Sequence, residues 1–350
     1  MTIPQTMLAA RLVGHGGPEV LELVEVPVPA PAEGEALVRV GATALNNTDL
    51  WTREGAYGRP GAPDALSGWR GPIDFPRIQG ADVAGTVVEV GAGVDPGWRG
   101  RRVLIDPAIY DRDAEDANPV GLLGSERDGG YARYVTTPAA RLHDIGGSPL
   151  SDVEAACFPT AYGTALGMLE RGDVREGEDV VVTGASGGVG LALVQLAAAR
   201  GARVLAISSA GKLDAVRSAG AVEVVDRADD PWARLAERAP GGVDAVLDVA
   251  AGDHVGEGLP LVREGGRWVV AGALAGHRVE FDVRRLYLHN IALIGSSMHT
   301  PAHFRALAEI VRGGRVRPVI ALTQELAEVH RAQAELATRA HVGKVVLAGG

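Results

Sequence analysis

The chain has 350 residues, a length that suggests about two domains because one hydrophobic core rarely serves more than ~250–300 residues. Apolar residues make up 46% of the chain and charged residues 22%, and no apolar run approaches the ~20 residues that a membrane-spanning helix needs. The formal net charge of -10 gives no general attraction to nucleic acid or anionic lipid, so neither is an expected partner.

The N-terminal residues and the number of cysteines indicate in which cellular compartment the protein is expected. Residues 1–12 lack the basic-then-apolar layout of a signal peptide, which predicts a cytoplasmic protein. The single cysteine, Cys157, excludes an internal disulfide and a zinc site of four thiolates. It is expected to be a small buried residue, because no base stands near it in the sequence.

Short alternating segments dominate the first 150 residues. Residues 21–28 and 36–45 alternate as strands do, and loops rich in glycine and proline separate such segments. This pattern predicts irregular, mainly β structure. Within it, residues 49–55 are expected to form a short helix that Asn47, Thr48 and Asp49 can cap.

Strands and helices alternate from about residue 155 to residue 298. The predicted strands cover residues 179–185, 203–208, 223–226, 244–250, 267–272 and 291–297, and the predicted helices cover 189–201, 212–220 and 230–239, the last with Asp230 as its cap. The alternation predicts a doubly wound parallel sheet, hence an α/β protein. Two amphipathic helices, 301–313 and 324–340, and a strand, 344–349, are expected to follow.

A glycine-rich segment, residues 183–190, lies between the first of these strands and its helix. Gly187 and Gly190 match the second and third glycines of the dinucleotide motif G-x-G-x-x-G, while Ala185 stands in the first place. Such a loop lets helix N-terminal amides meet a pyrophosphate. The cofactor-binding candidates here are Ser186, Gly187, Gly188, Val189 and Gly190.

The same segment also contains the hydrolase motif G-x-S-x-G. In that alternative Ser186 is a nucleophile, and Asp248 with His277 or His289 completes a triad in the required order. Gly190 and the start of the following helix favour the dinucleotide interpretation. Loss of esterase activity in Ser186→Ala would be required for the hydrolase.

The end of the second predicted strand indicates the cofactor. An acidic residue there would bind the ribose 2'-hydroxyl of NAD, but the sequence reads AISSAGK. Ser208, Ser209 and Lys212 offer two hydroxyls and a cation to a 2'-phosphate, with Arg217 as a further cation nearby. The predicted cofactor is therefore NADPH; the alternative is that Lys212 is only a solvated residue in a helix's first turn.

Several collinear segments, including residues 84–94, 125–135, 159–166, 262–272 and 343–347, resemble the medium-chain dehydrogenase/reductase superfamily. The resemblance implies a GroES-like, mainly-β substrate domain from residues 1–155 and 299–350. It also implies a Rossmann dinucleotide-binding domain from residues 156–298, with an active-site cleft at the junction. Edge-to-edge pairing of Rossmann sheets is common in the family, so a homodimer is expected.

The zinc-dependent members of this family hold a catalytic metal through a Cys in C-x-T-D, a His in G-H-E and a later Cys or acid. The matching positions here are Asn46, Ala81 and Ala156, so no metal site is expected, and Asp82 alone cannot hold zinc. The lobe that carries a structural zinc in those enzymes matches residues 105–130, which lack a thiol and are interpreted as a surface loop.

Without a Lewis acid, hydride addition to an activated C=C bond or a quinone remains possible. This chemistry belongs to the zinc-free quinone and enoyl reductases of the family, which this sequence resembles most. Tyr57 lies eleven positions after Asn46, where mitochondrial-type enoyl reductases carry a tyrosine implicated in protonation. Tyr57 is therefore the catalytic candidate for the proton donor; the alternative is that it is only an aromatic residue packed under the loop. Asn46 is the second candidate, as an amide donor to substrate or nicotinamide.

Other candidates follow from family position. Thr160 and Thr164 match threonines near the nicotinamide in relatives, and four residues follow the ends of parallel strands, where ligands bind: Gly272, Ala273, Ser296 and Ser297. Lys344 either reaches the cofactor or flanks a strand. His299 and His303 are predicted to be solvated residues at a helix start rather than metal ligands, and the acids of residues 111–116 a solvated loop.

The predicted function is reduction of an enone, enoyl thioester or quinone by NADPH without zinc. Two alternatives stay open. One is an alcohol or carbonyl oxidoreductase of the same fold that has dispensed with zinc. The other is an NADPH-binding sensor or structural protein with little catalysis, because a fold does not determine a function.

Overall fold

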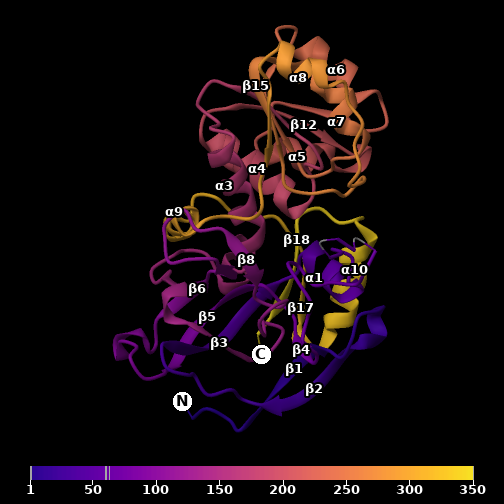
Figure 1. The fold of residues 1–350 in the computed structure, drawn as a ribbon. Coiled ribbons are helices and arrows are strands. Elements are labelled where there is room, and N and C mark those ends of the chain that lie inside the picture. Colours follow the sequence, from indigo (N-terminus) through magenta and orange to yellow (C-terminus); the bar gives the residue numbers. More distant parts are fainter. Residues whose placement is uncertain (1, 60, 63, 350) are drawn as a thin grey trace. The chain divides into compact units, whose positions relative to one another are not determined.

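The computed structural model describes residues 2–59, 61–62 and 64–349. The chain forms two compact units, the first from residues 1–160 and 300–350 and the second from residues 161–299 (Figure 1). No helix in the described part of the chain is both long and apolar enough to cross a membrane.

The first unit is built mainly from antiparallel strands, as expected for a GroES-like domain. One sheet has the order β2-β1-β4, a larger one has the order β10-β6-β5-β3-β18-β17 with β9 also paired to β3, and β7 pairs with β8. Its strands are β1 (Thr6–Leu12), β2 (Leu21–Pro27), β3 (Glu35–Ala44), β4 (Arg77–Ile78), β5 (Asp82–Val90), β6 (Arg102–Ile105), β7 (Ala108–Tyr110), β8 (Pro119–Leu122), β9 (Tyr134–Pro138), β10 (Leu142–Asp144), β17 (Ile320–Glu325) and β18 (Lys344–Ala348). Its helices are α1 (Asn47–Glu54), α2 (Asp152–Ala155), α9 (Pro301–Gly313) and α10 (Val329–Thr338).

Strand pairing brings the two ends of the chain together in this unit. β18 runs antiparallel to β3 with Val346 opposite Ala44, and the Leu45 N–H donates to the Val345 carbonyl at 2.9 Å. Leu45, Val345 and Leu347 are buried in one apolar cluster, so side-chain packing fixes this register. The pairing places Lys344, the first residue of β18, beside the start of α1.

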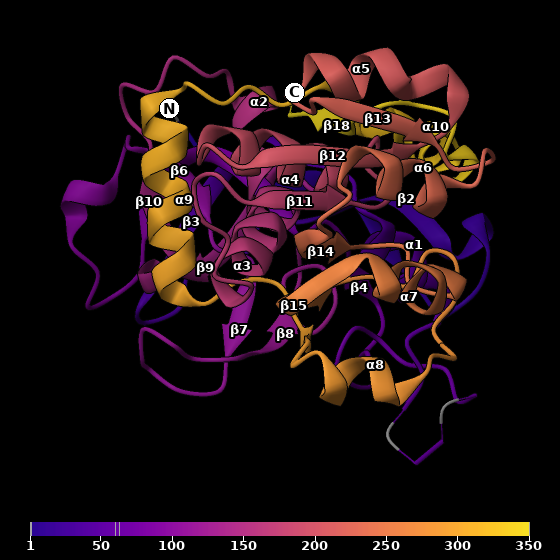
Figure 2. The ribbon, with the colours of Figure 1, turned by 90° about the horizontal axis from the view of Figure 1, so that it is seen from above.

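The second unit is a Rossmann-type domain with six parallel strands in the order β13-β12-β11-β14-β15-β16 (Figure 2). The strands are β11 (Asp179–Val182), β12 (Arg203–Ser208), β13 (Glu223–Asp226), β14 (Val243–Asp248), β15 (Val262–Val270) and β16 (Ala292–Gly295). The helices are α3 (Gly163–Arg171), α4 (Gly188–Ala199), α5 (Leu213–Ser218), α6 (Pro231–Arg238), α7 (Asp253–Gly258) and α8 (Val283–Leu288). A π-helical turn, η4 (Phe158–Tyr162), precedes α3.

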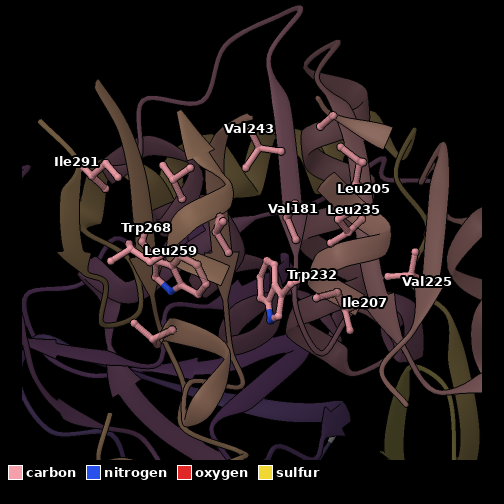
Figure 3. Close-up of a cluster of buried hydrophobic side chains, with 14 of the residues drawn as sticks. Val181, Leu205, Ile207, Val225, Trp232, Leu235, Val243, Leu259, Trp268 and Ile291 are labelled. Carbon is pink, nitrogen blue, oxygen red and sulfur yellow. The ribbon is translucent and has the colours of Figure 1, made fainter. Parts of the chain in front are cut away.

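Apolar side chains of α6, such as that of Leu235, pack on the strands of this sheet (Figure 3), and Val255 of α7 belongs to the same buried cluster. Trp232 of α6 and Trp268 of β15 are buried with ring centroids 5.5 Å apart, and strand residues such as Val181 and Leu205 belong to the same buried cluster. Strands buried in this way carry continuous apolar runs, which explains why DVVV and RVLAI were recognisable in the sequence.

Three local predictions are corrected by the structure. The helix predicted over 324–340 is wrong in its first two residues, because 320–325 form β17 and pair in parallel with β18; residues 326–328 form a 3-10 turn, and the α-helix begins at Val329. Asp230 is at the N-cap of α6, but it has a left-handed backbone (φ 42°) and its side chain makes no capping bond. His299 is fully buried rather than solvated.

The lobe of residues 105–130 contains a small hairpin, β7 with β8. Asp106 is buried and accepts hydrogen bonds from the Ala108 N–H (3.0 Å) and the Tyr110 hydroxyl (2.9 Å). Asp111 accepts from the Asn118 N–H at 3.0 Å. Carboxylate hydrogen bonds therefore tie this lobe together, and its acidic residues 111, 113, 115 and 116 are exposed as predicted.

Candidate functional site

The first group of candidate residues lies at the N-terminus of α1. Asn46 is the N-cap with an extended backbone, and its N–H donates to Asp49 Oδ2 at 2.7 Å. The helix ends at Gly55, which has φ 70°. Asn-Asn-Thr-Asp thus supplies a capped helix start whose positive end lies at residues 46–49.

The Lys344 ammonium lies beside Asn46. Its Nζ donates to the Asn46 Oδ1 at 2.6 Å and to the Leu45 carbonyl at 2.7 Å, and it is 3.4 Å from Asp82 Oδ2. The Lys344 side chain is 4% exposed and that of Asp82 is 0% exposed. This is a buried ion pair joined through a carboxamide, an arrangement that is stable only while both charges remain partnered.

The Asn46 side chain is held on all sides. Its Nδ2 donates to Asp82 Oδ2 at 3.0 Å and to the Ala44 carbonyl at 3.3 Å, while its oxygen faces Lys344. The other Asp82 oxygen accepts the Thr160 N–H at 2.7 Å. For the Asn46 amide nitrogen to donate to a ligand, the longer of its two hydrogen bonds, to Ala44, must therefore be given up.

A second buried carboxylate, Asp49, lies behind Asn46. Its Oδ2 also accepts from the Tyr131 hydroxyl at 2.9 Å. Burial raises the pKa of Asp49 to about 7, with a contribution from the nearby Asp82 charge, while hydrogen bonds from Asn46 and Tyr131 act in the opposite direction. The Asp49 carbonyl accepts from Gln79, which also bonds to Gln333 of α10, so the helix start is tied to the C-terminal part of the chain.

Tyr57 is linked to the same helix start. Its hydroxyl donates to Thr48 Oγ1 at 2.8 Å, and its ring meets that of Trp51 edge-on with centroids 5.6 Å apart. Burial raises the pKa of Tyr57 above its ordinary value. Because the tyrosine donates, the Thr48 hydroxyl keeps its own proton for another acceptor, and Thr48 is half-buried rather than enclosed.

The positions that match family metal ligands carry few donors. Ala81 and Ala156 are fully buried, and the Cys157 thiol donates to the Val153 carbonyl at 3.3 Å. Burial raises the pKa of Cys157 to about 12. Within residues 2–59, 61–62 and 64–349, no three His, Cys, Asp or Glu side chains form a group that could hold a metal ion.

In the second unit the glycine loop joins β11 to α4. Gly184 has φ 57°, and a Cβ on Gly190 would come within 2.2 Å of the Gly184 carbonyl, so the turn and the helix pack closely. Gly184 rather than Ala185 therefore supplies the tight turn that the motif's first glycine makes. Gly187 is the N-cap of α4 and, as a glycine, has no side chain that could cap that terminus. Its free amides fit a pyrophosphate.

The end of β12 carries a polar group that includes a residue the sequence reasoning missed. The buried Ser208 hydroxyl has no hydrogen-bond partner among the described residues. The Arg227 N–H donates to the Ser208 carbonyl at 2.7 Å. Burial lowers the pKa of Lys212, and the charge of Arg227 lowers it further, so the two cations are neighbours. Arg217 instead pairs with Asp214 at 2.8 Å.

Asp248 has a structural role that argues against the hydrolase alternative. Its Oδ1 accepts from the Thr183 hydroxyl (2.5 Å) and from the N–H groups of Ala250 (2.8 Å) and Ala251 (2.9 Å). Its Oδ2 accepts from the Trp268 indole at 3.0 Å. The carboxylate is thus hydrogen-bonded to Thr183, the first residue of the glycine loop, whereas a Ser-His-Asp triad needs it to accept from a histidine.

The remaining candidates lie at strand ends. A Cβ on Gly272 would come 2.7 Å from the Val249 carbonyl, so this glycine allows the ends of β14 and β15 to approach. Ser296 is buried and its hydroxyl accepts from Arg171, while Ser297 is exposed. Thr164 is buried in α3, and the buried Thr160 Oγ1 has no partner among the described residues. Ala273 follows Gly272 and is half-buried.

Two of the missed residues, Thr48 and Arg227, had a usable signal. Thr48 was interpreted only as a cap, although it occupies the threonine of the family's C-x-T-D motif. Arg227 directly follows the third strand, whose end neighbours that of the second strand in a doubly wound sheet. Lys344 gave only a weak signal, because its position depends on pairing between the two ends of the chain.

Two family models match this chain. "Alcohol dehydrogenase GroES-like domain" matches residues 32–147, and "Zinc-binding dehydrogenase" matches residues 188–312. The first match lies within the GroES-like unit, and the second covers most of the Rossmann-type unit and continues to residue 312, in α9 of the first unit.

Individual proteins match over nearly the whole chain. Acryloyl-coenzyme A reductase of Metallosphaera sedula is 30% identical over 97% of this chain and 99% of its own length. Quinone oxidoreductase of Rattus norvegicus is also 30% identical, over 97% of each chain. A solved structure of a candidate alcohol dehydrogenase from Sinorhizobium meliloti 1021 is 43% identical, with a TM-score of 0.94 and coverage of 99% of this chain and 97% of that one.

Proposed function

Because this chain belongs to the medium-chain dehydrogenase/reductase superfamily, we propose that it is an NADPH-dependent reductase of activated C=C bonds or quinones that works without zinc. The observation that carries the proposal is the buried group of Lys344, Asn46 and Asp82. The relatives named as an acryloyl-coenzyme A reductase and a quinone oxidoreductase support the same substrate classes.

The residues at the metal-ligand positions do not fit zinc. The Asn46 oxygen is occupied by the Lys344 ammonium, and Ala81 and Ala156 have no donor atom. Zinc in proteins prefers thiolate, imidazole and carboxylate, and a fixed ammonium repels a dication at this distance. The one nearby thiol, Cys157, has a raised pKa and stays protonated at neutral pH. We therefore assign no catalytic step to a metal.

The second unit fits a nicotinamide dinucleotide. The uncapped N-terminus of α4 would hold the pyrophosphate, and the unpartnered Ser208 hydroxyl with Lys212 and Arg227 would hold a ribose 2'-phosphate. When bound, the reduced nicotinamide supplies a hydride. The absence of an acid at the end of β12 supports NADPH over NADH.

The first unit would stabilise the charge that hydride addition creates on the substrate carbonyl oxygen. We assign that task to the Thr48 hydroxyl, because Tyr57 donates to its oxygen and leaves its proton free. The N-terminus of α1 adds a favourable dipole at the same place. Tyr57 would hold the Thr48 hydroxyl in place through its hydrogen bond rather than act directly on the substrate, and Asn46, held by Lys344, would fix the helix start.

Thr48→Val is expected to lower kcat by about a hundredfold or more, as removal of a single oxyanion donor does elsewhere, while Thr48→Ser retains most of the rate. Tyr57→Phe is expected to lower kcat by about tenfold, because it removes only the hydrogen bond behind the threonine. Stopped-flow measurement of NADPH oxidation with an enone would give these rates. An unchanged rate in Tyr57→Phe would remove the tyrosine from the mechanism.

Cofactor preference gives a separate prediction. Arg227→Ala and Lys212→Ala should each raise the KM for NADPH by about tenfold, since each removes a charge-assisted hydrogen bond, and should leave the KM for NADH unchanged. Arg217→Ala is the matched control because its guanidinium is paired with Asp214. Equal effects on both cofactors would contradict a 2'-phosphate site at these residues.

The function itself is tested by NADPH oxidation against quinones, enones, enoyl thioesters and aldehydes, with NADH and added zinc as controls. We expect turnover of at least one of the first three classes without zinc. Turnover of aldehydes alone would favour an alcohol or carbonyl oxidoreductase, the alternative that the 43% identical candidate alcohol dehydrogenase supports. Tight NADPH binding without any turnover would instead favour a sensor or structural protein.

We also propose that the protein is a homodimer. β16 lies at one edge of the six-stranded sheet, with Leu293 exposed, and the adjacent α8 exposes Val283, Tyr287 and Leu288. An apolar, unpaired edge strand favours pairing with a second copy. Sedimentation velocity of the purified protein distinguishes a dimer from a monomer, and a monomer at micromolar concentration would count against the proposal.

A further inference from the structure

Helix α3 presents three residues, spaced by four, to the segment that follows β16. A Cβ on Gly163 would lie 2.4 Å from the His299 ring, and a Cβ on Gly167 would lie 2.1 Å from the Met298 carbonyl oxygen. The two glycines therefore let residues 298 and 299 lie directly on the helix. Arg171, one turn further along the same face, completes the contact.

Arg171 holds three consecutive residues of this segment. Its Nη1 donates to the Ser296 Oγ and to the Met298 carbonyl, both at 2.9 Å, and its Nη2 is 3.5 Å from the Ser297 carbonyl. Hydrogen bonds from a guanidinium are stronger than neutral ones, and a planar donor group fixes direction as well as distance. The clamp is defined here as Arg171 with residues 296–298.

The residue under the clamp has an unfavourable backbone. Met298 has φ 49° and is 5% exposed. Non-glycine residues keep such a conformation only where their surroundings enforce it, and these sites cluster at functional positions. The left-handed turn separates an exposed Ser297 from the buried Ser296 and Met298 on either side.

We propose that Arg171 is a positioning residue for the cofactor. It holds Met298 in the left-handed conformation and thereby keeps Ser297 exposed at the end of β16, ready to contact the nicotinamide end of NADPH. The inference takes NADPH as the cofactor from the proposed function. It gives the two serines different roles: Ser297 contacts the cofactor, while the Ser296 hydroxyl accepts a hydrogen bond from Arg171.

Four variants test the clamp: Arg171→Met, Met298→Gly, and Arg171→Met combined with either Met298→Gly or Met298→Ala. Arg171→Met should weaken NADPH binding by about tenfold, since hydrogen bonds from a charged group are worth about this factor in an equilibrium constant. Met298→Gly should restore most of the loss, because glycine adopts positive φ without strain. Met298→Ala is the matched control and should restore none.

The measurements are NADPH dissociation constants from nucleotide fluorescence and hydrogen exchange of the Ser297, Met298 and His299 amides. Arg171→Met should speed that exchange whether or not NADPH binds. If the wild-type protein does not bind NADPH, the proposed cofactor is wrong, but the exchange rates still test whether Arg171 holds residues 296–298. Wild-type affinity in Arg171→Met, or equal rescue by glycine and alanine, would overturn the inference. If Arg171→Met does not fold, Arg171→Lys, with an intermediate loss, replaces it.

Discussion

Lys344→Met is expected to lower the free energy of unfolding by about 3–5 kcal/mol, the typical cost of leaving one partner of a buried ion pair behind. The Asp82 carboxylate is fully buried and would lose its cation, while methionine keeps the length and apolar stem of lysine. The same change should reduce kcat/KM by about a hundredfold, because Asn46 loses the donor that orients it and small displacements at a reacting site carry costs of this size.

A double-mutant cycle separates the two effects. Asp82→Asn in the Lys344→Met background removes the remaining buried charge, so most of the unfolding free energy should return, whereas activity should stay low because Asn46 is still unsupported. Urea unfolding and steady-state NADPH oxidation measure the two quantities. A double variant as unstable as Lys344→Met, or a stable and active Lys344→Met, would contradict the importance of this ammonium.

Titration of Asp49 is expected to make the protein less stable as the pH rises from about 4 to 7. The folded-state pKa of about 7 lies above the ordinary value of 3.8, so the folded chain binds the proton more tightly than the unfolded chain does. The stabilisation from this tighter proton binding is fully present below the unfolded-state pKa and is lost as the pH rises through the folded-state pKa. Above the folded-state pKa, the stability no longer changes with the titration of Asp49. About three units at ~1.4 kcal/mol each give an effect of about 4 kcal/mol.

Asp49→Asn isolates this effect, since asparagine is neutral at every pH and its oxygen can still accept from Asn46 and Tyr131. The variant's stability relative to wild type should rise between pH 4 and 7 and then stay level. Chemical unfolding at a series of pH values gives the comparison, and Asp113→Asn, at an exposed position, is the control. Parallel curves for Asp49→Asn and wild type would show that folding does not raise the pKa of Asp49 and would contradict this prediction.

The second unit was largely predictable because its signals are local. Buried parallel strands such as β11 carry uninterrupted apolar runs, and the glycine loop occupies the eight residues directly after one of them. The candidates from Ser186 to Ser297 are therefore found at strand ends, where the alternation predicted them. Asp230 was misjudged because a cap-forming residue type does not reveal its backbone angle.

The first unit was less predictable because its site depends on distant pairing. Nothing near Lys344 in the sequence indicates that β18 pairs with β3, three hundred residues earlier, and only that pairing brings its ammonium to Asn46. Residues 324–328 have a helix-forming composition, yet pairing with β18 makes the first two part of a strand. The sequence predicts that Asn46 stands in the place of a metal-binding cysteine, but it does not reveal that the Lys344 ammonium donates to the Asn46 oxygen.

The location of Lys344 in β18 has a consequence for biosynthesis. Residues 161–299 are continuous, so the second unit can fold as soon as it leaves the ribosome, as domains generally do. The first unit must wait for residues 344–348 to emerge before Asp82 acquires its counter-charge and β3 its neighbour. A nascent chain arrested before residue 344 should therefore contain a protease-resistant second unit beside a first unit that is still cleavable.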